Sequence, residues 1–369
     1  MNSKLFSRLS VVLFLLVLCL TLSAQAGTVP RVLILGTGGT IAGAANGNSA
    51  TGYSAAKLGV QEIVASLPGV QQLKVHLEME QTVNISSQNM NFAVWKKLAE
   101  RIQKAVKNNE ADAFVITHGT DTLEETAFFL DQVLHINNPV VLVGSTRPAD
   151  SISADGPKNL LNAIRTAVDI DSFGRGVLVC YNERIFGARY VTKASTWNLD
   201  TFKASMGGPI GFVDDLRAHY FVGSEPKLKS PFSIDISNLK DLPKVDIISM
   251  YAGASAEAIE ASIKGGAKGI VISGVGDGNM PDECLLACRQ ASQKGIVVVR
   301  STRIPENYVH RDHEFKDSDY GTYAAYDLTP QKARLLTQLL IVAGIKDPQK
   351  IQAAFIGDYP GPMRYIDED

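Results

Sequence analysis

Two hydrophobic patterns alternate along most of the chain. Short, unbroken apolar runs that lead directly into Gly, Ser, Thr or Asp are typical of strands buried on both faces of a parallel sheet. These runs first occur at residues 32–35, 113–116, 140–143 and 176–179. Between them, apolar positions recur at helical spacing in residues 60–66, 90–107, 122–134 and 156–168. This order predicts a large, doubly wound α/β domain, whose ligands bind at the carboxyl ends of the strands.

The alternation lapses into Ser, Pro, Lys and Asp at residues 223–243, which we expect to link two domains. It then resumes with apolar runs at residues 245–249, 269–273 and 297–300, and with helical patterns at 256–264, 282–293 and 330–343. The sequence therefore predicts a larger N-terminal domain (27–222), a linker, and a smaller C-terminal α/β domain (244–369).

The first 26 residues have the pattern of a secretory signal peptide. Lys4 and Arg8 precede an apolar run at residues 9–22, and a small-x-small cleavage pattern ends at Ala26. The run is shorter than the roughly 20 residues that a membrane-spanning helix needs. We therefore expect cleavage near Ala26 and a periplasmic or secreted mature protein without a membrane segment.

Composition narrows the class of protein further. Apolar residues make up 45% of the chain and charged residues 20%, as in a packed globular protein. With 36 basic and 38 acidic side chains the net charge is −2, so no basic excess points to a nucleic-acid partner. Cleavage leaves Cys180, Cys284 and Cys288, an odd number, and the last two are one helical turn apart. We expect free thiols and no disulfide framework.

A Gly-rich turn, Leu35-Gly-Thr-Gly-Gly-Thr-Ile-Ala-Gly43, follows the first predicted strand. A dinucleotide-binding turn would need glycine in the place of Ile41, and a phosphate-binding loop would need Gly-Lys-Ser/Thr. The turn fits neither pattern. Its glycines allow the backbone to approach a small ligand beside the hydroxyls of Thr37 and Thr40, whereas the simpler alternative is a sharp turn with capping threonines.

A second polar cluster, residues 116–125, follows the next predicted strand. Thr120 would lie at the carboxyl end of that strand, with the negative charge of Asp121 beside it. Asp121 and Glu124 also have the spacing of a capping box, so the cluster is compatible with a simple helix start. Two Thr-bearing turns at the ends of two strands in one sheet nevertheless suggest a shared site with an activated hydroxyl nucleophile.

With these two turns, the chain resembles the bacterial type II L-asparaginases, the exported branch of the asparaginase/glutaminase amidohydrolases. Other family-like stretches occur in the same order over nearly the whole mature chain: residues 83–88, 143–148, 153–157, 191–193, 274–279 and 329–334. The resemblance implies two α/β domains, a homotetramer built as a dimer of intimate dimers, a small amide substrate, and no metal or cofactor.

Carried over by motif, the resemblance implies that Thr40 attacks the side-chain amide of L-asparagine and forms an acyl-enzyme that water hydrolyses. Tyr53 would lie near Thr40, and Thr120 would position the amide or water together with Asp121 and Lys193. Because a lysine keeps its proton at neutral pH and an adjacent carboxylate favours the charged form, we assign Lys193 to a proton relay with Thr120. The general base for Thr40 stays open.

The resemblance also implies the substrate contacts. Ser87 and Gln88 match positions that hold the α-carboxylate and ammonium ends of the substrate. Asp121 and Glu314 would supply negative charge for that ammonium, with Glu314 reaching a neighbouring subunit's site. The remaining expected substrate-binding positions are Gly39, Ser145 and Asn279.

The signals for amide selectivity conflict. Asn279 resembles the asparagine-preferring members, whereas Ser145 and residues 305–312 resemble the dual-specificity ones, and Asp277 stands where asparagine is commoner. Since a pocket discriminates one methylene by only about 1–3 kcal/mol, we expect an asparaginase with secondary glutaminase activity. The alternative within the family is a dual-specificity glutaminase-asparaginase.

A metal site and two other classes of protein each require features of their own. His310 and His313 are three residues apart, but no nearby Cys or further His completes a metal set, so we expect a polar loop there. An exported amino-acid-binding protein would share the predicted domains but release no ammonia. A subunit of a tRNA-dependent amidotransferase would be cytoplasmic, with an added domain and a basic surface.

Overall fold

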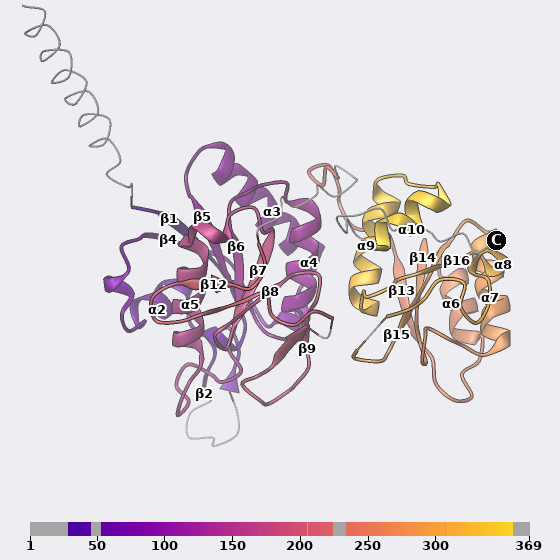
Figure 1. The fold of residues 1–369 in the computed structure, drawn as a ribbon, viewed down its shortest axis with the longest axis horizontal. Helices are drawn as coiled ribbons and strands as arrows, with labels where there is room; N and C mark the ends of the chain where they lie inside the picture. Colours follow the sequence, from indigo (N-terminus) through magenta and orange to yellow (C-terminus); the bar gives the residue numbers. More distant parts are fainter. Residues whose placement is uncertain (1–28, 46–52, 205, 224–233, 307, 357–369) are drawn as a thin grey trace, which may run out of the picture.

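The computed structural model describes residues 29–45, 53–204, 206–223, 234–306 and 308–356, which form two α/β domains side by side (Figure 1). The predicted signal peptide lies outside the described residues, as does the end of the chain from residue 357. Within the described part of the chain, no helix has the length and apolar character to cross a membrane.

The N-terminal domain is built on an eight-stranded sheet in the order β12-β11-β8-β7-β6-β5-β1-β4. Five strands are parallel: β1 (Arg31–Gly38), β4 (His76–Ile85), β5 (Ala113–Thr117), β6 (Val140–Val143) and β7 (Val177–Tyr181). Three antiparallel strands extend one edge: β8 (Arg184–Gly187), β11 (Gly211–Val213) and β12 (Ala218–Tyr220). Two small pairs complete the domain: β2 (Ala44–Ala45) with β3 (Tyr53–Ser54), and β9 (Val191–Lys193) with β10 (Phe202–Ala204).

Helices cover both faces of this sheet, as the sequence predicted. They are α2 (Val60–Ala65), α3 (Phe92–Lys107), α4 (Leu123–Val133) and α5 (Gly156–Val168). In β1, Leu33 and Leu35 pack into one core with α3 and α4, while Val32 and Ile34 pack into a second core with α2 and α5. Because alternate residues of a strand face opposite sides of the sheet, both sets must be apolar, which explains the unbroken runs.

The structure adds strands that the sequence analysis did not predict. Strand β4 lies at the edge of the sheet, and of its residues only Thr82 is buried, so it carries no continuous apolar run. Strands β8 to β12 have three or four residues each, which is too short for a pattern to emerge.

The C-terminal domain has a parallel four-stranded sheet in the order β13-β14-β15-β16. Its strands are β13 (Val245–Ser249), β14 (Gly269–Gly274), β15 (Val297–Thr302) and β16 (Thr322–Ala324). Its helices are α6 (Glu257–Lys264), α7 (Asp282–Gln293), α8 (Asp317–Tyr320), α9 (Pro330–Val342) and α10 (Pro348–Ile356). The three predicted strands and three predicted helices are confirmed, whereas β16, α8 and α10 were not predicted.

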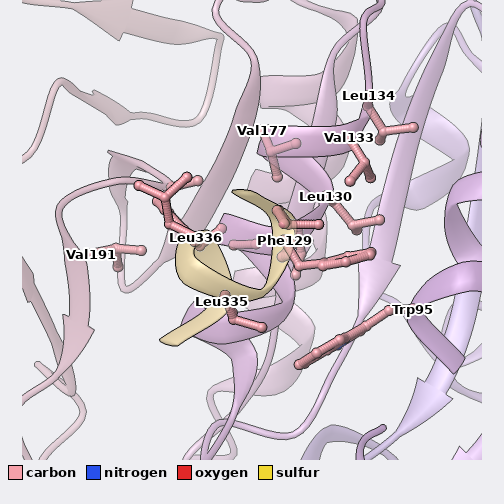
Figure 2. Packing of buried hydrophobic residues seen from close by; sticks show 14 of the residues in the cluster. Trp95, Phe129, Leu130, Val133, Leu134, Val177, Val191, Leu335 and Leu336 are labelled. Carbon is pink, nitrogen blue, oxygen red and sulfur yellow. The ribbon is translucent and has the colours of Figure 1, made fainter. Parts of the chain in front are cut away.

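The two domains share one hydrophobic core. Figure 1 shows α9 on the side of the C-terminal domain nearest to α4, and Figure 2 shows Leu335 and Leu336 of α9 beside Phe129 of α4, all in the same buried cluster. Ile234 and Ile236, from the predicted linker, belong to this cluster too. The end of the predicted linker is therefore packed structure, and the domains hold a defined mutual position.

Candidate active site

The two Thr-bearing turns meet at the point where the strand order reverses. Strand β4 lies on one side of β1, whereas β5 and the parallel strands after it lie on the other. In sheets of this kind, the crevice at the carboxyl ends beside such a switch point is the usual ligand site. Thr40 opens a short 3₁₀ helix, η1 (Thr40–Ala42), just after β1, and Thr120 follows β5.

Two glycines allow these turns to touch. Gly39 has a φ of +83°, and a Cβ added there would lie 2.3 Å from the Cα of Gly119. A Cβ on Gly119 would lie 2.6 Å from Oγ of Ser87, which follows β4. No side chain fits in such a space, so any larger residue would push Thr40 and Thr120 apart.

A buried chain of hydrogen bonds fixes the second turn. The indole N–H of Trp95 lies 2.8 Å from Oγ1 of Thr126, which lies 2.9 Å from Nε2 of His118. Nδ1 of His118 lies 2.7 Å from the carbonyl oxygen of Gly119. Burial lowers the pKa of His118 to about 4, so the ring is neutral at pH 7, and the carbonyl places its proton on Nδ1. His118 therefore acts as a structural hydrogen-bond partner within this turn.

A polar cavity of about 390 Å³ opens between these turns. Of the expected site residues, seven line it: Gly39, Thr40, Ser87, Gln88, Thr120, Asp121 and Lys193. The cavity is also lined by Ala55, Ser86, Gly119, Thr146, Thr196 and Thr201, which the sequence analysis had not singled out as ligand contacts. The structure thus brings the two Thr-bearing turns together at one cavity.

The side chain of Lys193 links the hydroxyl of Thr120 to the carboxylate of Asp121. Its Nζ donates to Oγ1 of Thr120 at 2.8 Å and to Oδ1 of Asp121 at 2.6 Å. The Lys193 side chain is 19% exposed and that of Asp121 is 58% exposed, so solvent reaches the carboxylate more than the amine. The Lys193 amine therefore joins the Thr120 hydroxyl and the Asp121 carboxylate through two hydrogen bonds.

Lys193 is held in place by groups from both domains. Its backbone N–H donates to Oε2 of Glu124 at 2.5 Å. From α9, Nζ of Lys332 donates to the carbonyl oxygens of Arg189 at 2.8 Å and Val191 at 2.5 Å, just before Lys193 in the chain. Lys332 is 1% exposed, and burial lowers its pKa to about 8. The negative charge of Glu124 raises the pKa, but the effect of burial is larger. Lys332 lies in the family-like stretch at residues 329–334 but was not among the expected site residues.

The floor of the cavity is joined by further hydrogen bonds. The backbone N–H of Asp121 donates to Oγ of Ser87 at 3.3 Å, and Oγ1 of Thr122 donates to the Ser87 carbonyl at 2.7 Å. Oγ1 of Thr146 lies 2.6 Å from the hydroxyl of Tyr181. The first two contacts join the segments that follow β4 and β5, and the third joins the segment that follows β6 to the end of β7.

Ser145 does not line the cavity. Its side chain is completely buried, and Oγ donates to the carbonyl oxygen of Arg147 at 2.8 Å. The next residue, Thr146, lines the cavity instead. The stretch at residues 143–148 was thus found from the sequence, but the side chain that faces the ligand space is one position later.

The three expected residues still to be placed are Tyr53, Asn279 and Glu314. The backbone of Tyr53 pairs with Ala45 in the small β2–β3 sheet, and its side chain lies outside the described part of the chain. Nδ2 of Asn279 donates to Oε1 of Glu314 at 2.8 Å in the C-terminal domain. Neither residue lines this cavity of its own chain.

Among the described residues, the three that together could hold a metal ion are Asp277, His310 and His313. They lie in the C-terminal domain and do not line the cavity.

Comparison with known proteins agrees with this geometry. Residues 31–227 match the family "Asparaginase, N-terminal", and residues 244–355 match "Glutaminase/Asparaginase C-terminal domain". A relative named "Probable L-asparaginase periplasmic" from Haemophilus influenzae is 44% identical over 90% of this chain and 94% of its own. "L-asparaginase 2" of Escherichia coli is 43% identical with the same coverage, and "Glutaminase-asparaginase" of Pseudomonas fluorescens is 37% identical over 88% of this chain and 90% of its own.

A solved structure extends the likeness to three dimensions. The "Probable Cytoplasmic L-asparaginase" of Campylobacter jejuni superposes with a TM-score of 0.80 and 37% identity, covering 89% of this chain and 99% of the other. Because the likeness in sequence and fold runs through both domains and includes the turns that form the cavity, the chain belongs to the asparaginase family of amidohydrolases.

Proposed function

We propose that the chain hydrolyses L-asparagine to L-aspartate and ammonia through an acyl-enzyme on Thr40, with secondary activity on L-glutamine. The observation that carries this proposal is the cavity itself: it brings Thr40 together with Thr120, whose hydroxyl oxygen accepts a hydrogen bond from Lys193. At about 390 Å³, the cavity lies near the lower end of the roughly 300–1,000 Å³ typical of ligand pockets, which suits an amino acid.

In the first chemical step, Oγ1 of Thr40 forms a bond to the side-chain carbonyl carbon of asparagine. The carbon–nitrogen bond of the amide breaks, and the leaving nitrogen takes a proton and departs as ammonia. Water then attacks the resulting ester, releasing aspartate and returning the proton to Thr40. Thr120 and Lys193 form the proton relay beside the reacting amide. Nζ of Lys193 lies between Oγ1 of Thr120 and the Asp121 carboxylate and donates a hydrogen bond to each.

Polar groups at the cavity rim suit the ends of an amino acid. Asp121 supplies negative charge for the substrate ammonium, and Ser87 and Gln88 supply hydrogen-bonding groups. Asn279 and Glu314 form a hydrogen bond with each other in the C-terminal domain and do not line this cavity. We therefore propose that they complete the site of a neighbouring copy within a homotetramer. Such sharing requires at least a dimer.

The secondary activity follows from the small difference between the two amides. Glutamine has one more methylene than asparagine, a difference that a pocket discriminates by about 1–3 kcal/mol. Relatives of this chain carry both names, L-asparaginase and glutaminase-asparaginase.

We also propose that the protein is exported after cleavage near Ala26. The pattern of the first 26 residues supports export, and one relative is named periplasmic. The structural relative from Campylobacter jejuni is named cytoplasmic, so this point needs its own test: the N-terminal residue of the protein isolated from the producing cell.

Ammonia release from asparagine and glutamine tests the activity. Thr40→Ala should abolish turnover of both amides while asparagine still binds. Thr192→Ala is the matched control, because Thr192 neighbours Lys193 on β9 but does not line the cavity. Near-wild-type turnover by Thr40→Ala, or binding without ammonia release by the wild type, would refute the proposal.

A further inference from the structure

Three side chains of types that can bind a metal ion lie together at one end of the C-terminal sheet. Asp277 follows β14, and His310 and His313 lie between β15 and α8. Nδ1 of His310 is 3.1 Å from Oδ2 of Asp277, and Nδ1 of His313 is 2.7 Å from the same oxygen. All three ligand atoms lie within 4.8 Å of one another. Two imidazoles and one carboxylate thus converge on one point.

These distances are close to those of an occupied site. Zinc binds imidazole nitrogen and carboxylate oxygen at about 2.0–2.2 Å in a tetrahedron, which puts neighbouring ligand atoms about 3.3 Å apart. To reach this value, the oxygen–nitrogen distance must open by about 0.2 Å for His310 and by about 0.6 Å for His313. In the single chain, the histidine side chains are 58% and 64% exposed, so solvent can supply a fourth ligand there.

The two segments are preorganised by a buried ion pair. Arg300 and Asp317 are 2% and 1% exposed, and their side chains form two hydrogen bonds of 2.7 Å. The same guanidinium donates to the carbonyl oxygens of Asp277 at 3.1 Å and His310 at 3.0 Å. One rigid cation therefore holds the backbones on both sides of the cluster.

The carboxylate is also oriented from within the cluster. The backbone N–H of His310 donates to Oδ1 of Asp277 at 2.8 Å, which leaves Oδ2 to face both rings. Hydrogen bonds that fix a ligating carboxylate in this way are typical around metal sites. Asp277 adds a carboxylate oxygen to the two imidazole nitrogens of His310 and His313. This third donor was not predicted from the sequence.

We propose that Asp277, His310 and His313 bind a divalent transition-metal ion, such as Zn²⁺. Two imidazole nitrogens select this class of ion over Mg²⁺ and Ca²⁺, which prefer oxygen ligands. The ion would join the segment that carries Asn279 to the segment that carries Glu314, two residues already linked by a hydrogen bond of 2.8 Å. Metal binding can be measured without the reaction proposed above, so the two proposals can fail separately.

Calorimetric titration of the full chain, without a polyhistidine tag and after treatment with a chelator, tests the site. We expect one Zn²⁺ per chain, with affinity reduced at least about tenfold in His313→Ala and in Asp277→Asn, since each removes or weakens one ligand. His76→Ala is the matched control: His76 is exposed, lies near Glu78, and belongs to the other domain.

Titration with Co²⁺ gives a second readout, because its visible absorption reports nitrogen ligation and coordination geometry. The band should appear in the wild type and in His76→Ala and be lost in His313→Ala. His313 is an exposed residue, so its loss should leave thermal unfolding unchanged in the absence of metal. Absence of stoichiometric binding in the wild type, or unchanged affinity in His313→Ala, would overturn the proposal.

Discussion

Replacing Lys332 with methionine tests how helix α9 of the C-terminal domain holds the strand that carries Lys193. Methionine has nearly the same length, but it cannot donate to the carbonyl oxygens of Arg189 and Val191. Each buried carbonyl left without a donor costs about 1–3 kcal/mol. The variant also removes a buried positive charge, so the two effects partly offset each other at pH 7.

The pH dependence separates the two effects. Burial lowers the pKa of Lys332 from 10.5 to about 8. Between these values the unfolded chain binds a proton that the folded chain has released, so stability rises with pH. From pH 7 to pH 9.5, Lys332 should therefore add about 2 kcal/mol to the free energy of unfolding of the wild type. Lys332→Met has no amine at this position and lacks this rise. The gap, meaning the free energy of unfolding of the wild type minus that of Lys332→Met, should therefore increase by that amount.

Urea unfolding at pH 7 and pH 9.5, at one protein concentration, measures the gap. Lys264→Met is the control, because Lys264 is exposed on α6 and its replacement should leave the gap to wild type unchanged. In Lys332→Met we also expect kcat for asparagine to fall about ten- to a hundredfold, since β9 loses its support beside Lys193. A gap between wild type and Lys332→Met that is the same at both pH values would refute the reasoning about the buried charge.

Three further predictions concern the site. Thr120→Ala should lower kcat for ammonia release at least about a hundredfold by breaking the relay with Lys193, and an unchanged kcat would exclude that role. Asn279→Ser should shift the ratio of kcat/KM towards glutamine, and an unchanged ratio would place selectivity elsewhere. Glu314→Gln should raise KM for asparagine, and activity of the wild type should fall on dilution; a fully active monomer in sedimentation would contradict the shared site.

The parallel core of the N-terminal domain could be predicted because its strands are buried on both faces. Leu33 and Leu35 face one layer of helices, Val32 and Ile34 face the other, and the sequence therefore shows an unbroken apolar run. Strand β4 escaped prediction because it lies at an edge. Its ten residues pair with β1, and its apolar side chains are only partly buried, so the pattern carries little signal.

Local motifs predicted part of the site. Thr40 and Thr120 were found because each follows a buried strand in a distinctive turn, and a parallel sheet brings such turns together. Lys193 and Ser87 required the family resemblance, because each lies in a stretch with no chemical signal of its own.

Long-range partners were the part that sequence reasoning could not reach. Lys332 supports β9 from 141 residues away, and Asp277 meets His313 across 36 residues. Such contacts depend on how the two domains and their loops pack. The hydrophobic pattern around each residue does not predict them. The turn at residues 143–148 likewise decides which hydroxyl faces the cavity: the side chain of Ser145 is buried, and Thr146 lines the cavity.

The most direct test of hydrolysis through Thr40 is the mass of the protein during turnover. Wild-type protein is mixed with L-asparagine, quenched in acid within the first turnovers, and digested. The peptide that contains Thr40 should gain the mass of one aspartyl group, and Thr40→Ala should carry no such adduct and release no ammonia. An adduct on Thr120 instead, or ammonia release by Thr40→Ala at the wild-type rate, would contradict a nucleophilic role for Thr40.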